Sequence, residues 1–186
     1  MEILTVMQKV GYATKHQVAK TQTQWKEGPS RVNNTDKKLK DEVVKGNLIH
    51  EDDYFKLKTC EGKHSAHSRD LTDCLIDILL INPEAIIIRE RLIEISMIPD
   101  SLILLRKGDK ARCLVLEVCT TETENFLQAK VNLWLNHPEA NRILSDIFQV
   151  KIPHFDIIIS GKPAPKGTIS LTQYLEEVCL YSSFFA

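Results

Sequence analysis

Two acidic residues stand at the ends of neighbouring apolar runs in the middle of the chain. Asp100 opens the run 102–105, and Glu117 is the single carboxylate in the run 113–119. The polar, glycine-bearing segment 106–110 between them is typical of a turn, so the sequence predicts two consecutive strands. Metal-dependent nucleases hold a cation with acids at the ends of neighbouring strands. Asp100 and Glu117 are therefore candidate metal ligands.

A second group of candidate residues lies on a basic segment nearer the start of the chain. The segment 30–45 has apolar positions at helical spacing, and Gly46 follows it, which predicts a helix. Lysine and arginine neutralise phosphates, and asparagine can bind adenine edges. The alternative is a solvated helix of mixed charge in a domain that binds protein, because Asp36 and Asp41 are interspersed. The candidate DNA contacts are Arg31, Asn33, Asn34, Lys37, Lys38, Lys40 and Lys45.

The elements around this helix predict a winged helix-turn-helix. Helices are expected over 2–10 and 14–19 ahead of it, and a hairpin over 48–58 follows it. In a winged helix-turn-helix the third helix enters the major groove and the hairpin forms the wing. The sequence thus predicts a DNA-binding domain over residues 1–67.

The second part of the chain, residues 68–186, is expected to be an α/β domain. A strand–helix–strand crossover implies a mixed sheet with helices packed against it. The expected helices are 68–81, 121–136, 139–149 and 170–184, and the expected strands are 86–95, 102–105, 113–119 and 155–160.

The composition is that of a globular protein whose two halves differ in charge. The chain has 186 residues, of which 43% are apolar and 26% charged, and its net charge is −1. Residues 1–68 carry 12 Lys+Arg and 9 Asp+Glu, so any contact with a polyanion is expected in the front half. Neither a signal peptide nor a membrane span is recognisable, which favours a cytoplasmic protein.

The five cysteines are expected to be free thiols. Their number is odd and no CxxC pair occurs, which is typical of a reducing compartment. Cys60, His64 and His67 form a C-x3-H-x2-H cluster, but this spacing matches no common zinc module. A polar loop with incidental histidines is the expectation there.

The order of these features resembles the replication-relaxation family, which is encoded mostly on plasmids and integrative elements of Gram-positive bacteria. The resemblance is carried by Pro99-Asp100, Glu117, the Thr120-Thr121-Glu122 turn, and the pair Lys130 and Trp134. It covers most of the chain, although its motifs are short. The family often has a tyrosine near the position of Trp134, so the match is partial.

The second domain of that family is similar to the PD-(D/E)XK nuclease superfamily, which implies a restriction-endonuclease-like fold. The resemblance implies a magnesium site at Asp100 and Glu117, with a lysine that stabilises charge on the phosphate. The superfamily lysine position holds Cys119 here, and Lys130 on the following helix is the candidate substitute. Glu90 and Glu94 are candidate third acids.

The resemblance implies a DNA-binding protein of a mobile genetic element that acts in plasmid replication, mobilisation or its regulation. Its nuclease-like domain is expected to be degenerate, because Cys119 replaces the lysine, and then no cofactor is needed. One alternative is a Mg²⁺-dependent endonuclease or nickase that uses Asp100, Glu117 and Lys130, and another is a transcriptional regulator. The expected partners are double-stranded DNA and a second copy of the chain.

Overall fold

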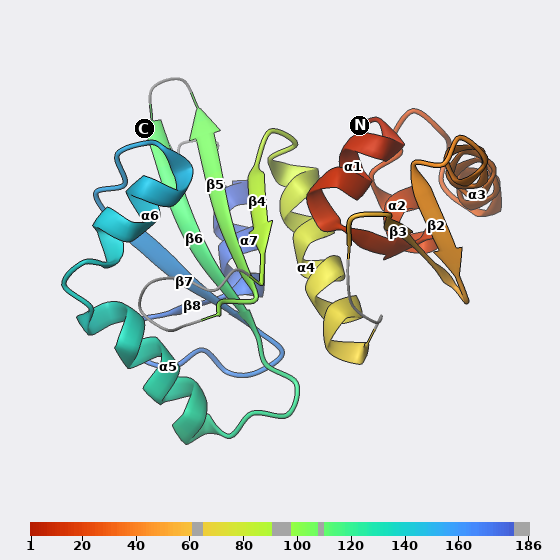
Figure 1. The fold of residues 1–186 in the computed structure, drawn as a ribbon. Helices are drawn as coiled ribbons and strands as arrows, with labels where there is room; N and C mark the ends of the chain where they lie inside the picture. Colours follow the sequence, from red (N-terminus) through yellow and green to blue (C-terminus); the bar gives the residue numbers. More distant parts are fainter. Residues whose placement is uncertain (61–64, 91–97, 108–109, 181–186) are drawn as a thin grey trace. The chain divides into compact units, whose positions relative to one another are not determined.

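The computed structural model describes residues 1–60, 65–90, 98–107 and 110–180 of this mixed α/β protein. The chain divides into two compact units, Met1–Pro83 and Glu84–Ala186 (Figure 1). Among the described helices, none is long and apolar enough to cross a membrane. The described cysteines that carry free thiols are Cys60, Cys74, Cys113 and Cys119, as the sequence predicted.

The first unit combines helices with a small antiparallel sheet. The three strands lie in the order β1-β3-β2, so the strand between the first two helices joins the hairpin (Figure 1). Val6, Met7 and Val10 of the first helix, at helical spacing, are fully buried. The elements are α1 (Ile3–Val10), β1 (Tyr12–Thr14), α2 (Lys15–Lys20), α3 (Pro29–Val44), β2 (Leu48–Glu51), β3 (Tyr54–Leu57) and α4 (Ala66–Ile81).

Helix α3 packs on the unit with one narrow face. It begins at Pro29, whose missing N–H is tolerated in the first turn, and Gly46 follows its end with a positive φ of 80°. Thr35 and Leu39 are its buried residues, and the Thr35 hydroxyl donates to the Arg31 carbonyl at 2.8 Å. Most of the remaining helix surface is therefore open to solvent.

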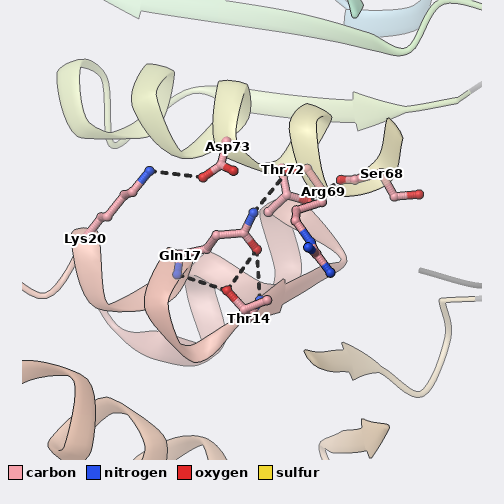
Figure 2. A network of polar contacts seen from close by, with 7 residues as sticks. All are labelled: Thr14, Gln17, Lys20, Ser68, Arg69, Thr72 and Asp73. Carbon is pink, nitrogen blue, oxygen red and sulfur yellow. Dashed lines mark hydrogen bonds and ion pairs between the residues drawn. The ribbon is translucent and has the colours of Figure 1, made fainter. Parts of the chain in front are cut away.

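Helix α4 belongs to the first compact unit, whereas the sequence interpretation placed residues 68–81 with the second domain. Figure 2 shows polar contacts that tie α4 to α2, among them the ion pair of Lys20 with Asp73. The Gln17 side chain, which is buried, donates to the Arg69 carbonyl at 3.1 Å. The Thr72 hydroxyl donates to the Tyr12 carbonyl at 3.1 Å. Because α4 completes the core of the first unit, the units divide at 83/84.

The second unit contains a five-stranded mixed sheet, as expected from the sequence. The strands lie in the order β4-β5-β6-β7-β8, with the first three antiparallel and the last three parallel. Strand β4 ends at Arg89 rather than near residue 95, and residues 91–97 lie outside the described residues. The elements are β4 (Ile86–Arg89), β5 (Ser101–Lys107), β6 (Lys110–Val118), α5 (Glu124–Asn136), α6 (Ala140–Phe148), β7 (Phe155–Ser160), β8 (Ile169–Ser170) and α7 (Leu171–Leu180).

Helices α5 and α6 form the crossover between the parallel strands β6 and β7, and they cover one face of the sheet (Figure 1). Trp134 of α5 is buried and meets Phe155 edge to face, with ring centroids 5.6 Å apart. On the other face, the Arg112 guanidinium lies over the Tyr174 ring of α7. The sheet is therefore covered on both faces, as a partly parallel sheet requires.

Candidate functional site

Glu117 is a carboxylate buried in the core of the second unit. Alternate residues of β6 point to the same face, so Glu117 shares the α5 side with Val115 and Cys119, which both belong to the core cluster. Its exposed fraction is 1%. A carboxylate is buried at a large cost in free energy unless a partner compensates it, so its neighbours determine its role.

Lys130 is that partner. Thr123 caps α5 by accepting a hydrogen bond from the Phe126 N–H at 3.3 Å, and Leu127 and Val131 anchor the helix in the core. The Lys130 ammonium then donates to Glu117 Oε2. The lysine side chain is 23% exposed, so the ammonium lies between the buried carboxylate and solvent.

Asp100 lies beside this ion pair. Ser101 is paired with Leu116 in the β5–β6 register, which brings the residue before β5 to the end of β6. Asp100 Oδ2 accepts a hydrogen bond from the Val118 N–H at 2.6 Å. The structure thus brings together Asp100, Glu117 and Lys130, the three catalytic candidates of the sequence, which we call the Glu117 site.

The buried position changes the acidity of Glu117. Burial raises the pKa of its carboxyl to about 7, and the Asp100 charge acts in the same direction. Lys130 opposes both by its charge and its hydrogen bond, but burial has the larger effect. The Glu117 carboxyl therefore changes its protonation near neutral pH, where a group that exchanges protons is most useful.

The Glu117 site offers carboxylate oxygens, the kind of ligand that Mg²⁺ prefers. Glu117 Oε1 is buried and has no hydrogen-bond partner among the described residues. No three His, Cys, Asp or Glu side chains in the described part of the chain are placed to hold a metal. Mg²⁺ is commonly bound by one or two carboxylates plus water, so Asp100 and Glu117 would suffice. The Glu90 side chain is exposed, and Glu94 lies outside the described residues.

Cys119, which stands at the lysine position of the nuclease superfamily, carries no positive charge. Its side chain is buried in the core cluster, and burial raises the pKa of the thiol to about 11. The only ammonium that the described residues bring to Glu117 belongs to Lys130. Sequence reasoning missed Lys162, whose ammonium donates to the Glu122 carbonyl in the loop before α5. Its position just after β7 was the available signal, because parallel strands end at one edge of a sheet.

The DNA-contact candidates on α3 fall into two groups. The side chains of Asn33, Asn34 and Lys37 are exposed and make no hydrogen bond with other described residues. The Arg31 guanidinium is only 15% exposed and donates to the Trp25 carbonyl at 2.7 Å, so it holds the α2–α3 linker. The other cations have partners on or near the helix: Lys40 binds Asp36 at 2.7 Å, Lys45 binds Glu42 at 2.6 Å, and Lys38 lies 4.8 Å from the Trp25 ring.

The β2–β3 hairpin carries acids at its tip. Glu51 binds Lys56 at 2.9 Å, and Asp53 lies 3.5 Å from Arg69 of α4. Asp52 has a positive φ of 52° in the turn. A tip of this charge repels phosphates unless cations beside it compensate.

The polar loop expected around Cys60, His64 and His67 is only partly described, because His64 lies outside the described residues. A comparison with models of known protein families and another with curated proteins found no match for this chain.

Proposed function

We propose that the first unit is a winged helix-turn-helix that binds duplex DNA with α3. The order of its elements supports this proposal. A helix, a strand and two helices precede a hairpin, and the early strand pairs with the hairpin in the order β1-β3-β2. In such domains the third helix is the one that enters the major groove.

The outward face of α3 is the observation that carries the proposal. Asn33 and Asn34 lie in its first half and Lys37 just past its middle, with all three side chains exposed and without partners among the described residues. Asparagine can bind adenine through both amide groups in the major groove, and lysine neutralises a phosphate. Neither role would break a contact that these side chains make with other residues in the described part of the chain.

For DNA binding by the first unit, the positions of the charges matter more than the net charge. Residues 1–83 hold 13 Lys+Arg and 12 Asp+Glu, a net charge of only +1. Long-range attraction of DNA to the whole unit is therefore weak, and binding depends on local contacts of α3. We expect few phosphate contacts and a shallow dependence of affinity on salt.

Fluorescence anisotropy with a labelled duplex tests this proposal. Lys37→Ala is expected to weaken binding several-fold and to lower the salt slope by about 1, because one phosphate contact is lost. Asn33→Ala is expected to relax the preference among duplex sequences without changing the slope. Lys151→Ala, an exposed lysine of the second unit, is the matched control. Absence of duplex binding at low salt would remove the proposal.

The biological setting rests on the resemblance to the replication-relaxation family alone. It suggests a role on a mobile genetic element, in plasmid replication, mobilisation or its regulation. The second unit would then serve as a dimerisation or partner module. Sedimentation of the full chain tests the homodimer, and a footprint at one palindrome without cleavage would favour a transcriptional regulator.

A second candidate function is Mg²⁺-dependent cleavage of DNA at the Glu117 site. The buried Oε1 of Glu117 beside Asp100 favours it, because this oxygen has no hydrogen-bond partner among the described residues and could accept a ligand. Metal bound there would acidify a water molecule as the nucleophile. Asp100 and Glu117 would hold the metal, and Lys130 would stabilise negative charge on the phosphate.

Incubation of supercoiled plasmid with Mg²⁺ or Mn²⁺ tests this second function. Nicking that is lost in both Asp100→Ala and Lys130→Ala would support it. Nicking that survives in Asp100→Ala would indicate a contaminating nuclease. Intact plasmid under all conditions would leave the Glu117 site as a relict of an ancestral nuclease.

A further inference from the structure

A groove of about 520 Å³ lies in the first unit between α2, α3 and the β2–β3 hairpin, with α4 at its border. It is separate from the Glu117 site, because all of its lining residues belong to residues 1–83. Most of the lining side chains carry charge or titrate. The charged members are Lys15, Asp36, Lys40, Asp52, Asp53 and Arg69, and the titratable members are His16 and His50.

The permanent charges of the groove cancel. Three cations, one each from α2, α3 and α4, face three aspartates from α3 and the hairpin turn. Lys40 is paired with Asp36 at 2.7 Å and Arg69 with Asp53 at 3.5 Å. The Lys40 hydrogen bond lowers the pKa of Asp36, so this carboxylate stays charged in mildly acidic solution. With neutral histidines the groove therefore has no net attraction for an anion.

The two histidines decide the charge of the groove. His16 and His50 are both exposed, and the His50 ring stacks on Phe55 with centroids 4.3 Å apart and an angle of 10°. The stack fixes the His50 imidazole at the groove wall. Histidine changes its charge between about pH 5 and pH 8, and protonation of both would give the groove a net charge of +2.

We propose that this groove binds the DNA backbone beside the bases contacted by α3, and that it does so only when His16 and His50 are protonated. The inference rests on the proposed function and adds that DNA binding is regulated by pH. Duplex DNA approaching α3 would bring a phosphodiester to the groove, since Lys40 and Asp36 stand on the same helix as the base-contacting residues. Imidazolium N–H groups donate charge-assisted hydrogen bonds to phosphate oxygens. The acidic hairpin tip would then repel DNA at high pH and tolerate it at low pH.

Anisotropy titrations of one duplex at pH 8.0 and pH 5.5, each over a KCl series, test the inference. Two new phosphate contacts would steepen the salt slope by up to about 1.8 and tighten binding roughly five- to tenfold on acidification. The variant His16→Gln/His50→Gln is expected to lose this gain. His154→Gln, an exposed histidine of the second unit, is the matched control and is expected to retain it. Thermal melts establish that the double variant is folded.

The outcomes separate the inference from the function on which it rests. If the wild-type chain binds duplex equally at both pH values, or the double variant keeps the full gain, the inference is wrong while DNA binding stands. If the chain binds no duplex at either pH, both fail. A gain on acidification that follows His154→Gln instead would assign the effect to the second unit and would also contradict the inference.

Discussion

The substitution Glu117→Gln tests the energetic description of the buried carboxylate. In the folded chain the pKa of Glu117 is about 7, against an ordinary value of 4.5. Between these values the folded state binds more protons than the unfolded state, so the free energy of unfolding falls as pH rises through this window. This difference in pKa corresponds to a loss of stability on the order of 3 kcal/mol, complete above pH 7.

Glutamine has nearly the same size and cannot ionise, so the variant is expected to lack this pH dependence. The Lys130 side chain is 23% exposed, so its ammonium can reach water when the carboxylate is gone. We therefore expect the variant to be at least as stable as the wild type at pH 8, and the difference to vanish near pH 4.5. The substitution changes only the second unit.

The assay is urea unfolding from pH 4.5 to pH 8.5, followed by Trp134 fluorescence in a Trp25→Phe background. The chain has two tryptophans, and Trp134 is the buried one in the second unit, so its signal reports on that unit alone. Glu176→Gln, at an exposed position of α7, is the control and should follow the wild type. Parallel pH profiles of wild type and Glu117→Gln would refute the reasoning.

Three further predictions concern the metal, the linker and the tie between α2 and α4. Mn²⁺ at pH 8 is expected to raise the unfolding temperature of the wild type but not of Asp100→Asn, since a ligand that binds the folded state stabilises it; equal shifts would exclude this site. Arg31→Ala should destabilise the first unit by about 1–2 kcal/mol in denaturant unfolding, whereas exposed Lys37→Ala should stay within about 0.5 kcal/mol. Gln17→Ala removes the donor to the Arg69 carbonyl and half of the α2 capping box, so a loss of about 1–3 kcal/mol is expected, and an unchanged midpoint would contradict the tie.

The Glu117 site could be predicted because its geometry is local in the sequence. Two strands joined by a short turn must be antiparallel neighbours, which brings Asp100 to the end of the strand that carries Glu117. The helix after that strand must return along the sheet, and Lys130 lies early enough on it to reach back. The structure also confirms the mixed sheet, which follows from the same short connection and crossover.

The unit to which the helix at 66–81 belongs could not be predicted, because its contacts are with residues distant in the sequence. The apolar face of the helix at 66–81 fits either unit, and periodicity alone does not choose between them. One of the contacts that tie this helix to the first unit is made by Gln17, whose partner lies 52 residues away. Nothing in the sequence marks a glutamine as the donor to a distant backbone carbonyl.

The charges on α3 were only partly predictable. The partner of Lys40 stands four residues before it and that of Lys45 three residues before, so helical spacing could have revealed both pairs. The partner of Arg31 is a carbonyl in the linker, which spacing does not reveal. The number of basic residues in a segment is therefore larger than the number of cations that can bind phosphate without losing a partner.

An NMR titration of the ¹⁵N-labelled full chain with a short duplex tests most directly whether α3 binds DNA. We expect the largest amide shifts on the exposed side of α3, at Asn33, Asn34 and Lys37. Smaller shifts are expected in the groove at acidic pH. An α3 that does not respond to DNA, with shifts absent or centred on the Glu117 site, would contradict DNA binding by this helix.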